Sequence, residues 1–503
     1  MADETIADAT LAHRQAMAEL ITLDANLTPA DRLVLEGMIR DVRAGRDYED
    51  DNTASCQING NGTIKQTGTD AAADADVLST LDGLNDETDS RFEPTVFTSA
   101  DWRDVLQAAA TARKDAAGTA EMHVRARLRA WAQVALLERF VRLAQDHIVR
   151  HRTDVVFATH LLCYLGLVVP SAATLLFWHF SWLHGLLHTA LVLATCIGSY
   201  TIMMHQHIHQ GGVLRRDRVW TRAVDRLFPY LLDPLMGHTW NSYFYHHVKH
   251  HHVEGNGPDD LSSTLRFRRD SLLDFSCYLG RFLVLAWFDL PLYFYRTHRY
   301  HNAVRAGFWE LSSYVLLVGS YLLGSRAVLV TAPGAAFCVF LLPFAIMRMG
   351  LMLGNWGQHA FVDPDSPDSD FRSSITLVDV ASNRVCFNDG YHTSHHLNPR
   401  RHWRDHPRAF VRQKRVYAAE RALVFFGIDY LEITLRLILW QDYKHLALCL
   451  APLGPEQCRL SLDERADMLR RHTTAFSEAD IARFFPKTRS AAAWRRKQGL
   501  PAE

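Results

Sequence analysis

The stretch VVFATHLLCYLGLVVPSAATLLFW, from Val155 to Trp178, opens a part of the chain that carries no charged residue. No Asp, Glu, Lys or Arg occurs among the sixty residues from Val155 to Leu214. A helix that crosses a membrane needs about 20 consecutive apolar residues. Two such spans fit here, at about 155–178 and 184–205, with a tight turn between them. The sequence therefore predicts an integral membrane protein.

A second pair of apolar stretches fits two further spans, at about 306–325 and 327–348. The apolar stretch 272–296 differs, because it contains Asp274, Arg281, Asp289 and Pro291. Charges at the middle of a bilayer are costly, so we expect this stretch to form a helix that lies in the membrane interface. The predicted fold class is all-α: a polytopic membrane protein with four transmembrane helices in two hairpins and a cytosolic helical cap.

Arginines gather on the flanks of the first hairpin, between 125 and 152 before it and between 215 and 226 after it. The positive-inside rule then places both termini and the long loops in the cytosol. The expected localisation is a multi-pass integral membrane protein, in the endoplasmic reticulum if the source is eukaryotic. The N-terminus has neither the basic start nor the short apolar run of a signal peptide.

The rest of the chain has a different composition. The formal charge of the 503 residues is −1, which points to no nucleic acid or other polyanionic partner. The eight cysteines form no CxxC pair, which argues against a disulfide framework and a thiolate zinc site. We expect N-terminal helices followed by a disordered acidic linker at 45–95, which together form the segment 1–96, and basic cytosolic helices over 97–154. A catalytic membrane domain over 155–416 and a C-terminal cytosolic helical extension over 417–503 follow.

Histidine is the residue that this composition does not explain. The chain has 27, and five of the seven residues from His246 to His252 are histidine. The stretch HQHIH places His205 and His209 four residues apart, and HTSHH places three more at spacings of three and four. Both spacings stack imidazoles on one helical face. The third group is His392, His395 and His396.

The middle cluster leaves its register open. Either His247, His250 and His251 share a face, or His247, His251 and His252 do. Two spans precede the first cluster, none separates it from the second, and two separate the second from the third. All three clusters therefore face the cytosol, provided that 272–296 does not cross the membrane. Together they could supply eight neutral nitrogen ligands, enough for two metal ions.

Three histidine boxes interleaved with two hydrophobic hairpins resemble the membrane fatty acid desaturase superfamily over about residues 155–416. The stretches NDGYHTSHHLNPRRHW (388–403) and GNWGQHAFVD (354–363) resemble that family beyond the boxes. In the latter, Asn355 and His359 are similar to a pair that adds one ligand and one water-mediated contact. The resemblance implies two Fe ions, O2 as co-substrate, and a membrane lipid or acyl substrate. No haem signature of a fused cytochrome b5 is present, so we expect an external electron donor such as cytochrome b5 with its reductase.

Further residues near the boxes are candidates for supporting roles. Carboxylates that orient metal-bound imidazoles are expected within a few residues of the boxes, and the candidates are Asp389, Glu254, Asp259 and Asp260. The basic run after the third box lies on a cytosolic face and suits docking of an acidic electron donor through Arg400, Arg401 and Arg404. His207 lies on another helical face from His205, so a metal contact is the less favoured interpretation for it.

Three classes of function remain open. The first is an oxidoreductase that introduces a C=C bond into an acyl lipid. The second is a lipid hydroxylase, ketolase, acetylenase or decarboxylase on the same scaffold, which shares the first step of hydrogen abstraction. The third is a metal transporter or sensor with a histidine-rich loop. It is weakened because the expected spans contain no Asp or Glu apart from Glu310, whereas a permeation path usually shows polar ligands within the membrane.

Overall fold

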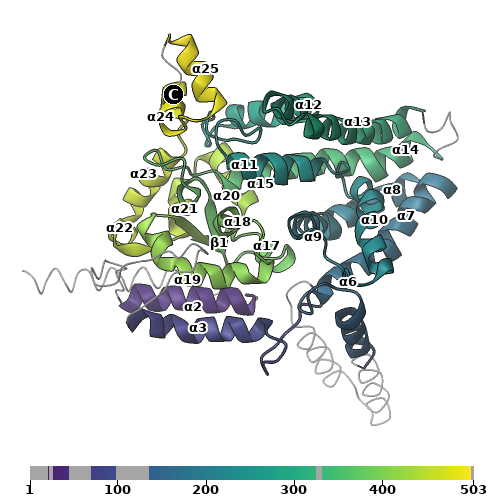
Figure 1. Cartoon of the computed structure of the whole chain (residues 1–503), viewed down its shortest axis with the longest axis horizontal. Helices are drawn as coiled ribbons and strands as arrows, with labels where there is room; N and C mark the ends of the chain where they lie inside the picture. The colour runs from purple at the N-terminus through teal and green to yellow at the C-terminus, as the bar shows by residue number, and fades with distance from the viewer. Residues whose placement is uncertain (1–20, 22–26, 45–68, 98–134, 324–330, 500–503) are drawn as a thin grey trace, which may run out of the picture.

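Figure 1 shows a computed structural model of the chain, which describes residues 21, 27–44, 69–97, 135–323 and 331–499. Helices dominate these residues. Long apolar helices extend to one side of the molecule, and shorter helices around a small sheet form a cap on the other side (Figure 1). The prediction of a mainly helical membrane protein is confirmed.

Four of the described helices are long and apolar enough to cross a membrane: Val155–Trp178, Trp182–Gln210, Leu272–Arg296 and Pro333–Gln358. Three of them are interrupted by π-helical turns. Their segments are α6 (Val155–Cys163), η1 (Tyr164–Val168), α7 (Val169–Ala173), η2 (Thr174–Trp178), α8 (Trp182–Leu191), η3 (Val192–Cys196), α9 (Ile197–Gln210), α12 (Leu272–Arg296), α14 (Pro333–Ala336), η5 (Phe337–Leu341) and α15 (Leu342–Gln358).

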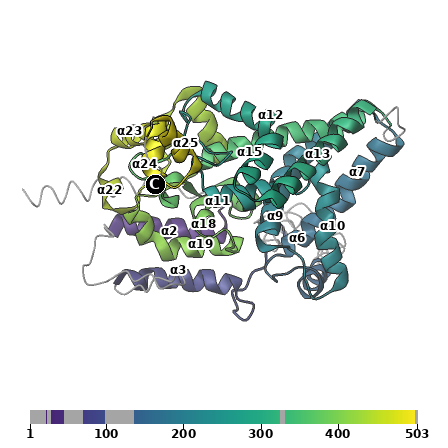
Figure 2. The ribbon, with the colours of Figure 1, turned by 45° about the horizontal axis from the view of Figure 1, so that its top comes forward.

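The four helices differ in one place from the four predicted spans. Helix α13 (Tyr300–Leu323) lies at the position of the predicted third span, but over its described residues it is not one of these four helices. Helix α12, which was predicted to be interfacial, is one of them. Length and composition do not distinguish a spanning helix from an interfacial one, so the interfacial placement of α12 stays a prediction. Figure 2 shows α12 lying across the neighbouring α15, at the edge of the cap.

Both ends of α12 contact the cap. Near its start, Phe275 and Tyr278 share a hydrophobic core with Ile438 of the cap. Near its end, the hydroxyl of Tyr293 donates to the carboxylate of Glu254, in the segment that carries the middle histidine cluster. A helix whose two ends reach the same polar layer is arranged as an interfacial helix requires.

The cap contains short helices and one small sheet. Strands β1 (Ile375–Val378) and β2 (Leu423–Phe426) pair in parallel, and β2 pairs antiparallel with β3 (Leu450–Ala451). The sheet is a departure from the all-α prediction, because apolar runs of four residues carry too little periodicity to separate a strand from a buried helix. Since β2 and β3 belong to the segment 417–503, that segment completes the sheet that begins with β1.

The remaining elements surround this sheet and the histidine clusters. Those before it are α10 (Val219–Leu235), η4 (Phe244–His251), α11 (His252–Glu254) and α16 (Asp370–Ser373). Those within and after it are α17 (Ala381–Val385), α18 (His392–Leu397), η6 (Trp403–Asp405), α19 (His406–Ala419), α20 (Tyr430–Leu435), η7 (Arg436–Trp440), α21 (Tyr443–Leu448), α22 (Gly454–Arg459), α23 (Leu462–His472), α24 (Glu478–Phe484) and α25 (Arg489–Lys497).

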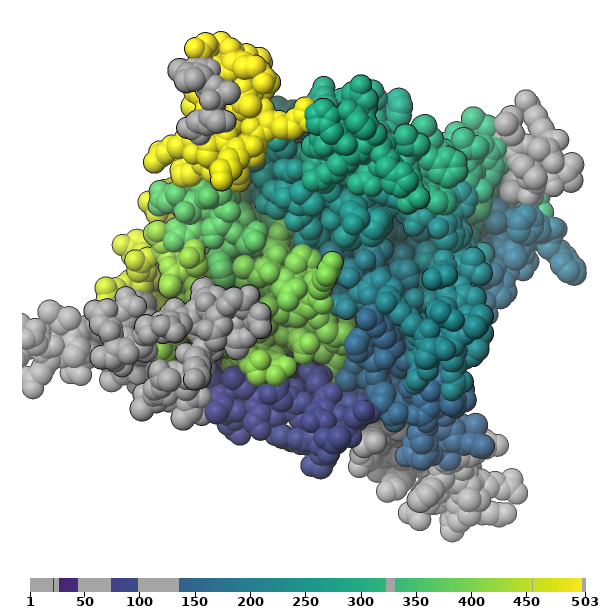
Figure 3. Space-filling view, viewed as in Figure 1, coloured from purple at the N-terminus to yellow at the C-terminus, as the bar shows by residue number. Residues whose placement is uncertain are grey.

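The N-terminal segment packs directly on the cap. Helices α2 (Pro29–Ala44) and α3 (Thr69–Asn85) lie along α19, and Figure 3 shows this purple segment against the green one. The prediction of a disordered linker over 45–95 is wrong for 69–85, because apolar side chains of α3 such as Val77 and Leu81 reach a core shared with α2 and α19. Residues 45–68 and most of 1–26 lie outside the described residues. Most of the predicted basic helices at 97–154 also lie outside them, and the described residues 135–147 are helical.

Buried polar contacts join the two segments. The ammonium group of Lys414 on α19 lies 2.5 Å from Asp41 and 2.8 Å from Asp74, and all three side chains are almost fully buried. The carboxylate of Asp31 accepts hydrogen bonds from the Tyr391 hydroxyl at 2.7 Å and from the Asn383 amide at 3.1 Å. Tyr391 immediately precedes the third histidine box. These contacts favour an N-terminal segment that supports the cap over one that is separate from it.

We expect the Lys414→Ala variant of the full chain to be strongly destabilised. Removal of one partner leaves two buried carboxylates without a counter-charge, which costs about 3–5 kcal/mol. Thermal unfolding of the detergent-solubilised protein is the measurement. Lys444→Ala is the matched control, because Lys444 and its partner Asp463 are both about three-quarters exposed, and exposed pairs contribute about 0–1 kcal/mol. Equal melting temperatures for the two variants would contradict the prediction.

Candidate metal centre

The first histidine box lies at the end of α9. Helix α9 ends at Gly211, which adopts the left-handed conformation (φ 68°) that glycine allows at little cost. His205 and His209 share the face that points to the other boxes. His207 points elsewhere and contacts the backbone carbonyl of Asp225 at 2.9 Å. The structure therefore keeps His207 out of the cluster, as the sequence interpretation favoured.

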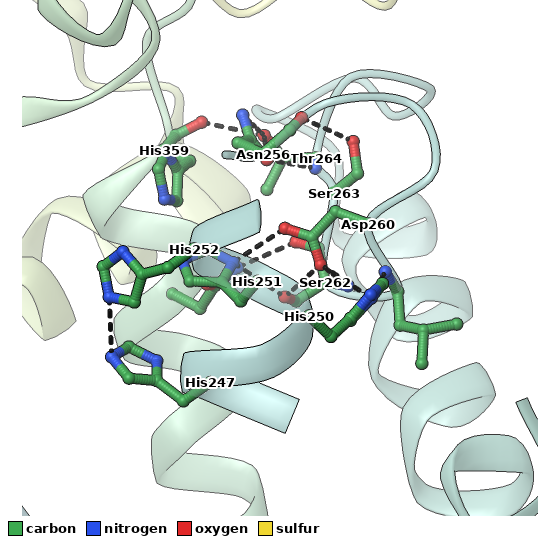
Figure 4. A network of polar contacts seen from close by, with 12 residues as sticks. His247, His250, His251, His252, Asn256, Asp260, Ser262, Ser263, Thr264 and His359 are labelled. Carbon is green, nitrogen blue, oxygen red and sulfur yellow. Dashed lines mark hydrogen bonds and ion pairs between the residues drawn. The ribbon is translucent and has the colours of Figure 1, made fainter. Parts of the chain in front are cut away.

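The middle box is wound as a π-helix, and this winding selects its register. In a π-helix the repeating hydrogen bond joins residues five apart. The Nε2 atoms of His247 and His252 accordingly lie 3.1 Å apart. His250 points to the opposite side, where its Nε2 accepts a hydrogen bond of 2.9 Å from the backbone N–H of Leu261 (Figure 4). His247, His251 and His252 thus form the face that meets the other boxes.

The third box forms the short helix α18, and a further histidine joins it from the end of α15. His359 donates from Nδ1 to the carbonyl of Ser373 at 2.7 Å. This contact leaves its Nε2 free to face the Nε2 of His392, 3.3 Å away. The rings of His359 and His396 lie 5.0 Å apart.

The boxes converge into two adjacent groups of imidazoles whose nitrogen atoms lie within 4.8 Å of one another in each group. The rings of His252 and His396, one from each group, are 5.2 Å apart. Eight of the ten predicted ligands are brought together, while His250 is turned away and His392 lies beside the second group. The first group is His205, His209, His247, His252 and His395, and the second is His251, His359 and His396.

The distances in the first group fit a metal ion. The Nε2 atom of His395 lies 3.0 Å from that of His205 and 2.8 Å from that of His252. Metal–imidazole bonds of about 2.1 Å, the length found for zinc, place neighbouring ligand atoms about 3.0 Å apart at right angles and about 3.4 Å apart in a tetrahedron. Three nitrogen atoms that face one another at such distances cannot all be satisfied by hydrogen bonds, because a neutral imidazole has one N–H donor.

Several ring nitrogens in the two groups also lack a partner among the described residues. They are buried, and they are His205 Nδ1, His209 Nε2 and His396 Nε2. A buried nitrogen without a hydrogen bond costs about 1–3 kcal/mol. The arrangement is therefore costly as a hydrogen-bonded cluster and suited to a set of metal ligands.

Protonation favours the same interpretation. Burial lowers the pKa of His359 to about 3. Burial also holds the pKa of His247 and His395 well below the usual range, and the neighbouring imidazoles add to the effect. These side chains are neutral at pH 7, and neutral imidazole is the form that binds a metal ion.

Asp260 is the carboxylate that contacts a clustered histidine most closely. Its Oδ2 accepts a hydrogen bond from His251 Nδ1 at 2.7 Å, and its Oδ1 accepts from the Ser262 hydroxyl at 2.8 Å (Figure 4). Burial by itself raises the pKa of Asp260, but its interactions with His251, and next with His250, bring that pKa well below its usual range. The carboxylate thus fixes the proton of His251 on Nδ1 and leaves Nε2 for a ligand bond.

The other proposed supporting residues lie in different places. Glu254 accepts a hydrogen bond from Tyr293 and contacts neither metal group. Asp259 binds Ser490 near the C-terminus. Asp389 faces the cavity described below, and burial, followed by the charge of Asp429, raises its pKa to about 7. The Asn355 amide donates to the Ser262 carbonyl at 2.9 Å, which places Asn355 at the level of the clusters.

Sequence reasoning missed two of the supporting contacts. The Ser373 carbonyl that orients His359 is a backbone group, so the contact cannot be predicted from the type of residue. Asp370, 3.8 Å from His396 Nδ1, lies more than twenty residues before the third box. A search limited to the neighbourhood of each box could not find either one.

The three arginines predicted to dock an electron donor have different surroundings. Arg404 is engaged by the N-terminal segment, with bonds of 2.6 Å to the Asn85 side chain and 2.8 Å to the Glu93 carbonyl. Arg401 donates to the Ser394 carbonyl at 2.8 Å inside the third box. Arg400 is exposed. Of the three, Arg404 is the least suited to docking, because its guanidinium already has partners within the fold.

A cavity of about 390 Å³ reaches the clusters from the apolar side of the molecule. His205, His247, His251, His392 and His395 contribute to its wall on one side. Apolar and small residues of α9, α12 and α15 contribute much of the remaining wall, among them Ile202, Leu290, Met347, Leu351 and Met352. An apolar cavity beside a buried cluster of imidazoles is suited to a long hydrocarbon chain.

Comparison with known proteins identifies the domain that contains this site. A family model described as fatty acid desaturase matches residues 180–427. This segment is a domain of the membrane fatty acid desaturase superfamily. The matched segment begins just after the first span and includes all ten candidate histidines. No curated protein and no solved structure matches the chain.

We expect His252→Ala to lose bound metal and His250→Ala to retain it. The two groups predict about two metal ions per chain, and only His252 has its ring nitrogen among those of a group. Purified proteins are compared by elemental analysis, with the melting temperature as a check of folding. Equal metal content in two folded variants, or loss only in His250→Ala, would show that the π-helical register is wrong.

Proposed function

We propose that this protein is a membrane-bound, non-haem diiron enzyme that uses O2 to introduce a C=C bond into an acyl lipid. The observation that carries the proposal is the placement of two imidazole groups at the wall of an apolar cavity. Family membership supports an oxidoreductase that acts on lipid, and the wholly nitrogen ligand set supports iron, because imidazole suits Fe(II) and adds no charge near the bilayer.

The residues of the chain have defined tasks in this proposal. The chemistry that a bound iron pair supplies is the activation of O2 for breaking an unactivated C–H bond. Asp260 and the Ser373 carbonyl hold protons at Nδ1 of His251 and His359, so the Nε2 atoms of both rings point to the site. The apolar walls from α9, α12 and α15 exclude water and align the chain, because a long acyl group buries its surface there.

The placement in the membrane is part of the proposal. We take the catalytic part as 155–416, with its histidine boxes and both termini on the cytosolic side, in the endoplasmic reticulum if the source is eukaryotic. The two cap contacts at the ends of α12 support an interfacial helix there. If α12 crossed the membrane in addition to α13 and α15, the second and third boxes would lie on opposite faces. If α12 crossed in place of α13, the two boxes would still share a face.

The outcome of the reaction separates this proposal from its alternative. A hydroxylase on the same scaffold would use the same metal groups and cavity, since both reactions begin with hydrogen abstraction. Lipid extracts of a simple host with and without the gene, analysed by mass spectrometry, distinguish them. We expect products that lack two hydrogens, and no such products from a host that carries His395→Ala. Hydroxylated products would support the alternative, and an unchanged lipid profile would contradict both.

Electrons are proposed to come from a separate protein, cytochrome b5 with its reductase. The reaction consumes two electrons in each turnover, and the chain lacks a haem signature of its own. Arg400 is the exposed cation beside the third box, and its backbone carbonyl accepts a hydrogen bond of 2.8 Å from Gln210, next to the first box. A donor that binds here would approach both boxes from the cytosolic side.

We expect Arg400→Glu to slow reduction by soluble cytochrome b5 about threefold or more at low ionic strength, because steering by exposed charge is long-ranged. Stopped-flow rates across a salt titration are the measurement, and the difference should disappear at high salt. Arg470→Glu, at an exposed arginine of α23, is the control. If both variants are reduced at the wild-type rate with their metal retained, Arg400 has no part in docking.

A further inference from the structure

A buried ion pair lies in the apolar part of the molecule, between α13 and α15. The Arg348 guanidinium donates from Nη2 to the carboxylate of Glu310, and the side chains are 8 % and 5 % exposed. The Tyr314 hydroxyl donates to the same carboxylate at 2.8 Å. The Phe282 and Phe344 rings lie 5.2 Å and 5.1 Å from the guanidinium carbon. Charged groups among apolar helices are expensive and often mark a functional site.

The ion pair borders the same cavity as the histidine clusters. Both Glu310 and Arg348 contribute to the cavity wall, beside the polar side chains of Thr239 and His246. Gly350 of α15 also faces this space, and a Cβ atom there would meet nothing within 4 Å. The cavity thus has an open, polar end in addition to its apolar walls.

Several polar groups at this end of the cavity have no hydrogen-bond partner. Among the described residues, Arg348 has partners only at Nη2, which contacts Glu310 and lies 3.5 Å from the Thr239 hydroxyl. Its Nε and Nη1 groups, which are donors, have none. The Nε2 atom of His246 is buried without a partner, and His246 belongs to neither metal group. A ligand with an oxygen atom would satisfy these groups, whereas a plain hydrocarbon would leave them unpaired.

The charge of the pair restricts the kind of oxygen. Glu310 already balances Arg348, so the site as a whole is neutral. A carboxylate or phosphate in this position would lie beside the Glu310 carboxylate in an environment of low dielectric, where repulsion is strong. A hydroxyl or carbonyl oxygen accepts a hydrogen bond from Arg348 without that cost.

The position along α15 gives the site a second property. Arg348 precedes Asn355 by seven residues, which is about 10 Å along a helix. Asn355 marks the level of the metal clusters through its contact with Ser262, whose hydroxyl lies 3.3 Å from His251 Nδ1. An oxygen atom bound by Arg348 would therefore lie at a fixed distance from the imidazole groups.

We propose that Arg348, with Glu310 and His246, binds a neutral hydroxyl or carbonyl oxygen of the lipid substrate and thereby sets which carbon reaches the metal centre. The part of this proposal that concerns which carbon reaches the metal centre rests on the proposed function. The substrate class is then an oxygen-bearing lipid, in preference to a plain saturated chain of the same length. The oxygen belongs either to the middle of the chain or to the head region of the lipid.

Binding is tested first, because it does not depend on turnover. A long-chain secondary alcohol and the alkane of the same length are compared for binding to the purified full chain by ligand-induced shifts in melting temperature. We expect the alcohol to bind about tenfold more tightly, as sites that hydrogen-bond a ligand hydroxyl discriminate against its absence. Equal binding of the two would overturn the proposal, whether or not any lipid is oxidised.

Turnover gives the second test. Saturated lipids with a hydroxyl at successive positions of the chain are supplied to membranes, beside a lipid whose hydroxyl lies in the head region. We expect the site of oxidation to shift with the hydroxyl, and the better substrate of the two kinds identifies the source of the oxygen. Oxidation at a position that ignores the hydroxyl overturns the inference but leaves the proposed function intact. If no lipid is oxidised, the proposed function fails, and the binding comparison still decides the polar site.

The double variant Glu310→Leu with Arg348→Met separates recognition from structure. Replacement of a buried ion pair by apolar residues of similar size is often tolerated by the fold. We expect bound metal to be retained and the preference for the alcohol over the alkane to fall toward one. Lys414→Met with Asp41→Leu and Asp74→Leu is the control, because it removes a buried ion cluster remote from the cavity. An unchanged preference in the first variant, or an equal loss in the control, would show that the ion pair is structural only.

Discussion

The cost of burying many imidazoles together is the constraint on which this structure depends. Eight histidines from four segments place their ring nitrogens in two groups, and neighbouring Nε2 atoms in the first group approach to 2.8 Å. Neutral rings have one donor each, so hydrogen bonds among them cannot satisfy every nitrogen. Packing of the surrounding helices holds the rings together despite this cost, and bonds to a metal ion would offset it.

The support for the rings comes from parts of the chain that are distant in sequence. Asp260 orients His251, and the Ser373 carbonyl orients His359. The third box is held from outside the matched family segment, since the Tyr391 hydroxyl beside it donates to Asp31 of α2. The C-terminal strands complete the sheet that precedes this box. Both ends of the chain thereby contribute to the rigidity of the site.

The cavity relates the site to the membrane. Its walls combine the apolar faces of α9, α12 and α15 with the imidazoles on one side and the Glu310–Arg348 pair on the other. An apolar wall favours any hydrocarbon chain and provides little discrimination between chains. Directional contacts with unpaired donors discriminate much more strongly, because a ligand that lacks the matching acceptor leaves them unsatisfied. The polar groups are therefore the part of the cavity in which selectivity can reside.

The sequence by itself determined the membrane class, the three boxes and most of the candidate ligands, because charge-free length and histidine spacing are local properties. It did not decide the register of the middle box, since a helix of ordinary pitch groups His247 with His250 and only the π-helical winding brings His252 to the site. Composition also favoured disorder at α3 and a docking role for Arg404. Tertiary packing made α3 a helix, because a segment that is polar in isolation becomes ordered when a neighbour buries its few apolar residues. It also gave the Arg404 guanidinium partners within the fold.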